Sequence, residues 1–145
     1  MKVVLQRVLS ASVSVDARVV GQIGPGYLLL VGIAVGDDES VVRRLAADVS
    51  KARLMTDAQG KMGTNLKDAG GEALAVSQFT LLADFSKGNR PSFNGAAKPE
   101  IAQPLFDLFV RELAALQGRP VPTGVFGADM RVELVNDGPV TVVLS

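Results

Sequence analysis

Apolar and polar positions alternate along the first part of the chain, which is the pattern of half-buried strands. Residues 2–8 alternate loosely, and Val13 and Val15 alternate with serines before a turn at residues 16–18. Apolar positions return after this turn, so the second segment has the pattern of a hairpin. Residues 27–35 are almost continuously apolar, as in a strand that is covered on both faces.

Two later segments have the 3.6-residue period of amphipathic helices. The first is expected to begin at the acidic residues 37–39, because negative charge suits the unpaired N–H groups of a helix N-terminus. The second is expected to run to about Gln117. Pro104 has no N–H, so we expect this helix to be regular only from Pro104 onward, after a looser first turn. Its expected buried side consists of Ile101, Leu105, Leu108, Leu113 and Leu116.

Three more apolar segments predict strands at residues 74–83, 130–135 and 140–144, and residues 57–60 have the composition of a hairpin tip. No internal repeat or linker divides the chain. Its 145 residues are enough to bury a core without disulfide bonds or metal. We therefore expect one α+β domain over residues 1–145, with many strands and two main helices.

The chain contains neither cysteine nor histidine. This excludes disulfide bonds, thiolate or histidine zinc sites, and catalysis by a Ser-His-Asp triad or a Cys-His dyad. A hydrolase of this composition must use carboxylates, hydroxyls, amides, backbone N–H groups or groups of the substrate itself. The longest apolar run, residues 28–35, is too short for a membrane span. We expect a cytoplasmic protein with no membrane partner.

The 15 basic and 15 acidic residues balance over the whole chain, but bases gather in two places. Lys87, Arg90 and Lys98 lie in a polar segment with no acidic residue between Asp84 and Glu100. The second group consists of Arg43, Arg44, Lys51 and Arg53. Each group is either ordinary solvated surface or a patch for a few phosphates of a nucleic acid.

Two polar stretches have both a structural and a functional interpretation. Residues 77–81, with the sequence SQFTL, lie in an expected strand, and buried polar groups are costly unless they are hydrogen-bonded. They form either a strand with one solvated face or a strand end that presents polar groups to a substrate. Residues 136–141, with the sequence NDGPVT, favour a hairpin turn, yet Pro139 removes a hydrogen-bond donor where a strand begins.

These two stretches together resemble the signature stretches of D-aminoacyl-tRNA deacylases. The resemblance covers nearly the whole chain in the right order, and no motif position departs from the pattern. It continues through LQRV at residues 5–8, DAQGKM at 57–62, RPSF at 90–93 and TGVFGADM at 123–130.

The resemblance implies a homodimer of compact, barrel-like β-sheet subunits with flanking helices, whose active site lies at the subunit interface. It implies hydrolysis of the ester between a D-amino acid and the 3′ end of tRNA, as proofreading. The family's Gly-Pro bond is cis and enters the other subunit's site, which here assigns chiral selection to Gly138 and Pro139. Arg7 matches the arginine that holds this pair, and Phe126 and Met130 match positions that line the adenosine pocket.

The predicted catalytic residues are Ser77, Gln78, Phe79 and Thr80. The Thr80 hydroxyl is a poor nucleophile because no base lies beside it in sequence. We instead expect backbone N–H groups near Phe79 and Thr80 to stabilise the oxyanion while water attacks, helped by the vicinal ribose hydroxyl. This reaction requires no metal and no organic cofactor.

Selection is expected to work by rejection, because an L side chain would clash with the backbone that binds the substrate ammonium. Glycine has no side chain, so glycyl-tRNA-Ala is a further expected substrate. Lys87, Arg90 and Lys98 are expected to hold the acceptor end of the tRNA. The alternatives are a non-catalytic tRNA- or RNA-binding dimer and a dimer with only a structural role.

Overall fold

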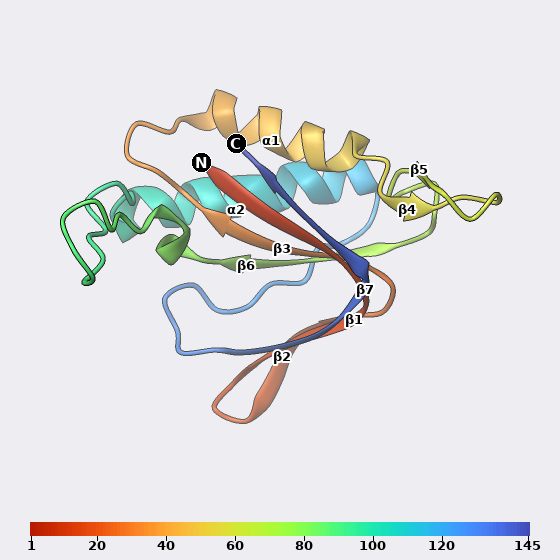
Figure 1. Cartoon of the computed structure of the whole chain (residues 1–145), viewed down its shortest axis with the longest axis horizontal. Helices are drawn as coiled ribbons and strands as arrows, with labels where there is room; N and C mark the ends of the chain where they lie inside the picture. Colours follow the sequence, from red (N-terminus) through yellow and green to blue (C-terminus); the bar gives the residue numbers. More distant parts are fainter.

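A curled five-stranded sheet carries two helices on one face (Figure 1). The computed structural model describes all of residues 1–145. The sheet contains β1 (Lys2–Val15), β2 (Arg18–Ile23), β3 (Gly26–Gly32), β6 (Glu72–Ser77) and β7 (Arg131–Leu144). The remaining elements are α1 (Glu39–Lys51), α2 (Pro99–Gln117), β4 (Met55–Thr56), β5 (Met62–Thr64) and the 3-10 helix η1 (Phe79–Leu82).

The long strand β1 organises the sheet. It pairs with β3 along residues 2–8, with β2 along residues 11–15, and with β7 over almost its whole length. β3 in turn pairs with β6 in parallel. Asp16 and Ala17 have φ values of 50° and 62°, which suits the two-residue turn between β1 and β2. The predicted N-terminal hairpin is therefore confirmed.

Buried side chains form one cluster on each face of the sheet. The larger cluster lies between the sheet and the helices and joins Leu29 of β3 to Leu45 of α1 and Phe109 of α2. The smaller cluster lies on the opposite face, where the sheet curls, and includes Leu28 and Leu74. β3 is thus covered on both faces, as its continuous apolar run predicts.

Helix α1 agrees with its prediction. The Asp38 carboxylate caps it by accepting a hydrogen bond from the Val41 N–H at 3.1 Å. Its buried side chains are Val42, Leu45, Ala46 and Val49. Neither α1 nor α2 has the length and apolarity that crossing a membrane requires.

The prediction for helix α2 was wrong in its start and in part of its buried face, although Leu108 and Leu113 are buried as predicted. The helix begins at Pro99, because proline suits a first helical position, and Pro104 lies inside it. Pro104 is on the exposed side, where water can replace the missing hydrogen bond. Ile101 is 57% exposed and Leu116 is 40% exposed, so neither belongs to the core. The buried residues are Ala102, Phe106, Leu108, Phe109, Leu113 and Gln117.

The C-terminal segment is one strand and not the two predicted ones. β7 continues through residues 136–141, so these residues do not form a hairpin turn. Its register with β1 shifts between the pairs Gln6–Thr141 and Val8–Asn136. The four residues 137–140 therefore bulge out opposite the single residue Arg7. A bulge is a place where a strand tolerates proline, since no ladder donor is needed there.

Candidate active site

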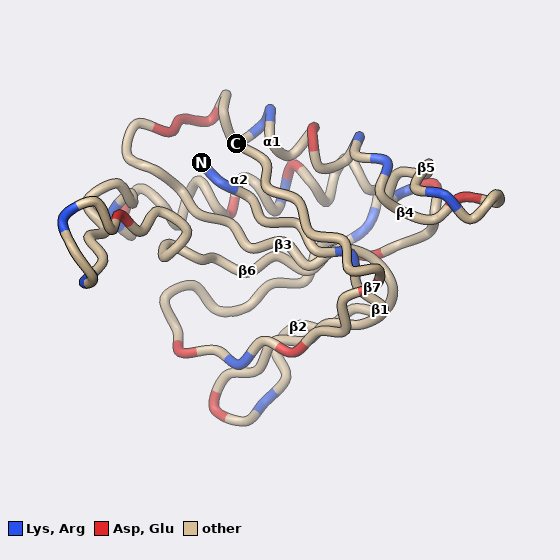
Figure 2. The backbone as a smooth tube through the Cα atoms, in the orientation of Figure 1, with Lys and Arg blue, Asp and Glu red and all other residues tan.

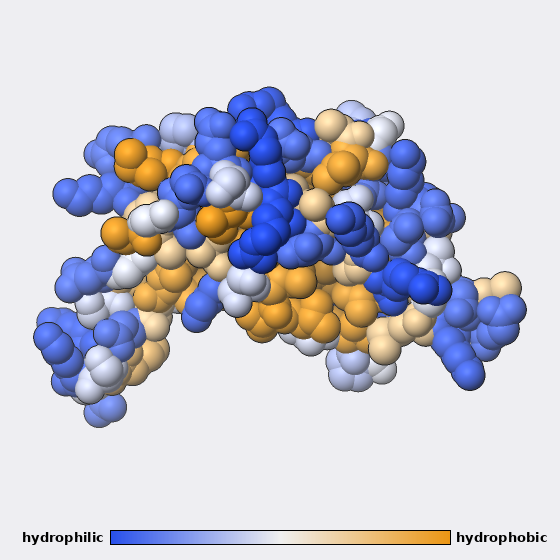
Figure 3. Space-filling view, turned by 90° about the horizontal axis from the view of Figure 1, so that it is seen from above, coloured by the Kyte–Doolittle hydropathy of each residue, from blue (hydrophilic) through white to orange (hydrophobic).

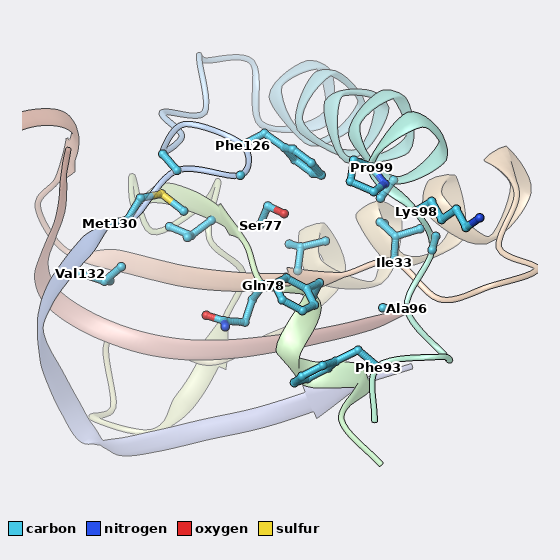
Figure 4. A pocket seen from close by; sticks show the side chains of 17 residues that line it. Ile33, Ser77, Gln78, Phe93, Ala96, Lys98, Pro99, Phe126, Met130 and Val132 are labelled. Atoms are coloured by element: carbon cyan, nitrogen blue, oxygen red, sulfur yellow. The ribbon is translucent and has the colours of Figure 1, made fainter. Parts of the chain in front are cut away.

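A pocket of about 520 Å³ opens between the end of β6, the start of α2 and residues 126–132 (Figure 4). Most of its wall is apolar, and Ser77, Gln78 and Lys98 bring the side-chain polar groups. Such a wall suits a ligand with a flat apolar part and a few polar groups. The lining is completed by Val31, Ile33, Val76, Phe79, Phe93, Ala96, Ala97, Pro99, Ala102, Phe126, Gly127, Ala128, Met130 and Val132.

The structure brings only some of the predicted site residues together. Six of them line the pocket, namely Ser77, Gln78, Phe79, Lys98, Phe126 and Met130. Thr80 is exposed next to the pocket lining. Lys87, Arg90, Arg7, Gly138 and Pro139 do not line the pocket of their own chain.

The turn after Ser77 creates the polar end of the pocket. β6 ends at Ser77, where a strand to residue 83 was predicted, and η1 follows at once. The N–H of Gln78 still donates to the Val31 carbonyl at 2.8 Å, which holds the turn against β3. Gly32 permits this approach, because a Cβ atom there would lie 2.9 Å from the Gln78 carbonyl oxygen. The segment therefore leaves the sheet at the pocket.

The first two N–H groups of η1 are free to bind a ligand. Neither the Phe79 N–H nor the Thr80 N–H donates a hydrogen bond within the chain. The first N–H groups of any helix lack partners inside that helix. The Phe79 ring stands against the Phe93 ring, with centroids 5.1 Å apart and planes at 70°. The aromatic pair fixes one side of the pocket next to these donors.

The Thr80 hydroxyl has no base beside it. Its hydrogen-bond partner is the Nε2 amide nitrogen of Gln78, which donates and cannot remove a proton. The only charged side chain in the pocket lining is that of Lys98. No group of three or more His, Cys, Asp or Glu side chains could hold a metal ion.

The aromatic and sulfur groups of the pocket come from two segments. Phe126 lies on the segment before β7 and packs against Phe106 of α2, with ring centroids 6.2 Å apart. Met130 closes the same segment and lines the pocket too (Figure 4). Phe93 and Pro99 also line it, although the sequence singled out neither as a site residue. Phe93 belongs to the RPSF stretch at residues 90–93, so the resemblance in sequence could have pointed to it as a site residue.

Arg7 joins the bulge of β7 to the rest of the fold. Its Nε atom donates to the Asp137 carbonyl at 3.0 Å, and its Nη1 atom donates to the Leu54 carbonyl at 2.8 Å. The Asp137 carboxylate lies 3.5 Å from Nε. Beyond this anchor, Gly138 and Pro139 are exposed and their peptide bond is cis.

Asn136 closes the bulge, and the sequence did not assign it a role. Its Nδ2 atom donates to the Val140 carbonyl at 3.3 Å and its Oδ1 atom accepts the Val140 N–H at 2.9 Å. The side chain thus spans the two ends of the bulge as a backbone ladder would. Asn is common in turns because it can make such local hydrogen bonds. This turn preference was the only feature of the sequence that could have indicated the role of Asn136.

The two basic groups differ in their surroundings. Lys87 and Arg90 lie in an exposed loop (Figure 2), which mutual backbone bonds of 2.8 Å between Asp84 and Ser92 close. Neither side chain takes part in an ion pair. Hydrogen bonds from Ser86 hold the pKa of Asp84 below its usual value, so this carboxylate is charged. In the second group, Arg43 pairs with Glu39 and Glu112, and Arg44 pairs with Asp48. This pairing favours solvated surface for those two arginines.

Comparison with known proteins agrees with the resemblance of the two signature stretches. The family described as D-Tyr-tRNA(Tyr) deacylase matches residues 4–145. The chain belongs to this family. The recognition based on SQFTL and NDGPVT is therefore confirmed.

Relatives named D-aminoacyl-tRNA deacylase match almost end to end. The protein of Dechloromonas aromatica is 54% identical over 144 residues, which are 99% of this chain and 96% of the relative. The protein of Chromobacterium violaceum is 57% identical over 142 residues, 98% of this chain and 95% of the relative.

Two solved structures share the fold. One is described as c-Myc DNA Unwinding Element Binding Protein, with 36% identity, a TM-score of 0.93, and coverage of 100% of this chain and 98% of that one. The other is described as a probable eukaryotic D-amino acid tRNA deacylase. It has 17% identity, a TM-score of 0.85, and coverage of 99% and 97%. The latter likeness is one of fold alone, and it agrees with the predicted α+β class.

Proposed function

We propose that this protein hydrolyses the ester bond of D-aminoacyl-tRNA and of glycyl-tRNA-Ala, and leaves L-aminoacyl-tRNA intact. It acts as a homodimer in the cytoplasm, as quality control for translation, and uses no metal or cofactor. The observation that carries the proposal is the pair of free N–H groups of Phe79 and Thr80 beside an apolar pocket, in a member of the D-Tyr-tRNA(Tyr) deacylase family.

In the proposed mechanism the ester carbonyl lies against these two N–H groups. They stabilise the negative charge that develops on the carbonyl oxygen, and they need no reorganisation because the turn is already held by β3. A water molecule attacks, assisted by the vicinal hydroxyl of the terminal ribose. The Thr80 hydroxyl does not attack, since its neighbour Gln78 is not a base.

The terminal adenosine is proposed to occupy the apolar part of the pocket, against Phe126 and Met130. Both line the pocket, and the Phe126 ring, which packs against Phe106 of α2, offers a flat stacking surface. Lys98 at the pocket and Lys87 and Arg90 on the adjoining loop are proposed to hold the phosphates of the acceptor end.

Gly138 and Pro139 are proposed to enter the pocket of a second subunit. Their carbonyls bind the substrate ammonium, and an L side chain clashes with this backbone. The proposal is supported by their exposure on the bulge, where they do not line the pocket of their own chain. Apolar surface also supports a homodimer, because hydrophobic areas lie between hydrophilic ones on the face in Figure 3. Exposed apolar residues of β1 and β7 are Leu9, Leu134, Val135 and Val143.

A non-catalytic tRNA-binding dimer is the second candidate, and the unpaired cations of Lys87 and Arg90 favour it. Turnover separates the two candidates. We expect purified protein to release D-tyrosine from D-tyrosyl-tRNA and to leave L-tyrosyl-tRNA near its uncatalysed rate. Equal rates on both substrates would contradict chiral selection, and tRNA binding without turnover would favour the second candidate.

A further inference from the structure

Tyr27 is the only tyrosine of the chain, and its side chain is completely buried. Its hydroxyl donates to the Ala52 carbonyl at 3.2 Å and accepts the Leu54 N–H at 3.3 Å. Burial raises the pKa of Tyr27 above its usual 10.0, so the hydroxyl keeps its proton near neutral pH. Both hydrogen bonds of this buried hydroxyl therefore go to the short segment between α1 and β4.

The same segment also forms a hydrogen bond with Arg7. The Leu54 carbonyl accepts the Arg7 Nη1–H at 2.8 Å, and Arg7 Nε donates to the Asp137 carbonyl at 3.0 Å. Tyr27 and Arg7 are also direct partners across β3 and β1. A continuous path of hydrogen bonds thus leads from the Tyr27 hydroxyl to the residue before Gly138.

Arginine needs such support to act as a rigid holder. Its long side chain has several rotamers, and its planar fork is fixed only when its acceptors are fixed. Leu54 lies directly before β4 and outside any helix or strand, and its carbonyl accepts the Arg7 Nη1–H at 2.8 Å. Its N–H is held by Tyr27 alone.

We propose that Tyr27 is a positioning residue for the Gly138–Pro139 segment and acts through Leu54 and Arg7. This inference rests on the proposed function, in which that segment selects the configuration of the substrate. A phenylalanine ring would fill the same space in the core, so packing by itself does not need the hydroxyl. Tyr27→Phe therefore separates positioning from packing.

The experiment measures kcat and KM on D- and L-aminoacyl-tRNA for wild type, Tyr27→Phe, Arg7→Lys and the double variant. The control is Gln117→Met, which removes another buried hydrogen bond, to Ser50, outside this path. Thermal midpoints are recorded for all variants, and the assays are run well below the lowest of them. Wild-type activity on the D substrate alone tests the proposed function, independently of Tyr27.

We expect Tyr27→Phe to lower kcat on the D substrate about ten- to a hundredfold, because small displacements of positioning groups have effects of this size. KM should stay within about twofold, and the preference for D over L should shrink. In the Arg7→Lys background the same substitution should add little, since both act on one path. The inference is overturned if Tyr27→Phe behaves like Gln117→Met, or if the effects of Tyr27 and Arg7 multiply independently.

A second measurement covers the case in which Tyr27→Phe does not fold. Because Tyr27 is the only tyrosine, growth on 3,5-difluorotyrosine replaces this residue alone. The fluorinated phenol ionises at lower pH. The phenolate still accepts the Leu54 N–H, but it cannot donate to the Ala52 carbonyl oxygen and is repelled by it, which displaces the segment that carries Leu54. We expect kcat on the D substrate to fall with rising pH more steeply than in unlabelled protein. Identical pH profiles would overturn the inference.

Discussion

The guanidinium of Arg7 donates to the backbone carbonyl of Asp137 at 3.0 Å and so connects β1 to the exposed residues Gly138 and Pro139. A second bond of 2.8 Å reaches the Leu54 carbonyl, on the other side of the guanidinium fork. Arg7 is only 8% exposed, so these bonds are shielded from water. A buried side chain with this geometry holds the bulge of β7 in a fixed place.

Arg7→Lys should therefore weaken both the fold and the chiral selection. A lysine ammonium has no planar fork and cannot serve both carbonyls, so we expect unfolding to become easier by about 1–3 kcal/mol. The preference for D- over L-aminoacyl-tRNA should fall at the same time. Urea unfolding and kcat/KM on both substrates measure the two effects.

The control is Arg43→Lys on the surface, with an expected change in the free energy of unfolding below about 1 kcal/mol. Lower stability with unchanged preference would show that Arg7 does not position Gly138.

Thr80→Ala should retain activity within about tenfold of wild type, because no neighbouring group activates the hydroxyl. The test is single-turnover hydrolysis of D-aminoacyl-tRNA, with folding checked separately, and Thr56→Ala serves as an exposed control. A loss of roughly a million-fold, or an acyl adduct on Thr80 seen by mass spectrometry, would establish Thr80 as the nucleophile.

The Phe79 N–H can be tested by comparing Phe79→Pro with Phe79→Ala. Both lose the ring, but only proline loses the N–H, and proline suits the first position of a helix. If this N–H stabilises the oxyanion, Phe79→Pro should have a kcat about a hundred- to a thousandfold below that of Phe79→Ala. Equal kcat values would remove the Phe79 N–H from the mechanism.

The sequence predicted correctly those elements that short stretches of residues specify by themselves. α1 has an acidic cap at Asp38 and a clear apolar stripe, and the β1–β2 turn has its own short signal. The end of β6 was missed because Leu81 and Leu82 continue the apolar pattern while they pack on Gly32 from η1. Periodicity does not distinguish a strand from such a turn, since both bury apolar side chains.

The sequence predicted candidate site residues but not how they are arranged in space. Six of the candidate residues do meet at one pocket: Ser77, Gln78, Phe79, Lys98, Phe126 and Met130. The bulge opposite Arg7 depends on a pairing of β1 with β7, at opposite ends of the chain, and no local signal encodes that register. The contact of Arg7 with Asp137 depends on the same long-range pairing, and its contact with Leu54 joins residues 47 positions apart in the chain, so both needed the structure.

Replacing Lys87, Arg90 and Lys98 with alanine should weaken tRNA binding. Each lost phosphate contact reduces the slope of log K against log salt by about 0.7–0.9, so three contacts correspond to about 2–3. The control replaces Lys61, Lys67 and Arg111, which are equally exposed and lie outside the pocket lining. Binding isotherms at several salt concentrations give both slopes. The same slope in both triple variants would make the loop ordinary solvated surface.

Glycyl-tRNA should be cleaved along with the D substrate, because the proposed selection works by a clash with an L side chain. Glycine keeps the ammonium that the carbonyls of Gly138 and Pro139 would bind, yet it has nothing to clash with this backbone. The experiment compares D-alanyl-, L-alanyl- and glycyl-tRNA-Ala on the same enzyme, so that the substrates differ only in the presence and configuration of one methyl group at the α carbon. We expect glycyl and D-alanyl esters to be hydrolysed at rates within about tenfold of each other, since one methyl group in a pocket changes binding by about 1 kcal/mol. The L-alanyl ester should remain near its uncatalysed rate. If the enzyme cleaves D-alanyl-tRNA-Ala and leaves glycyl-tRNA-Ala intact, then a pocket for the D side chain must select the substrate, and rejection by backbone is wrong.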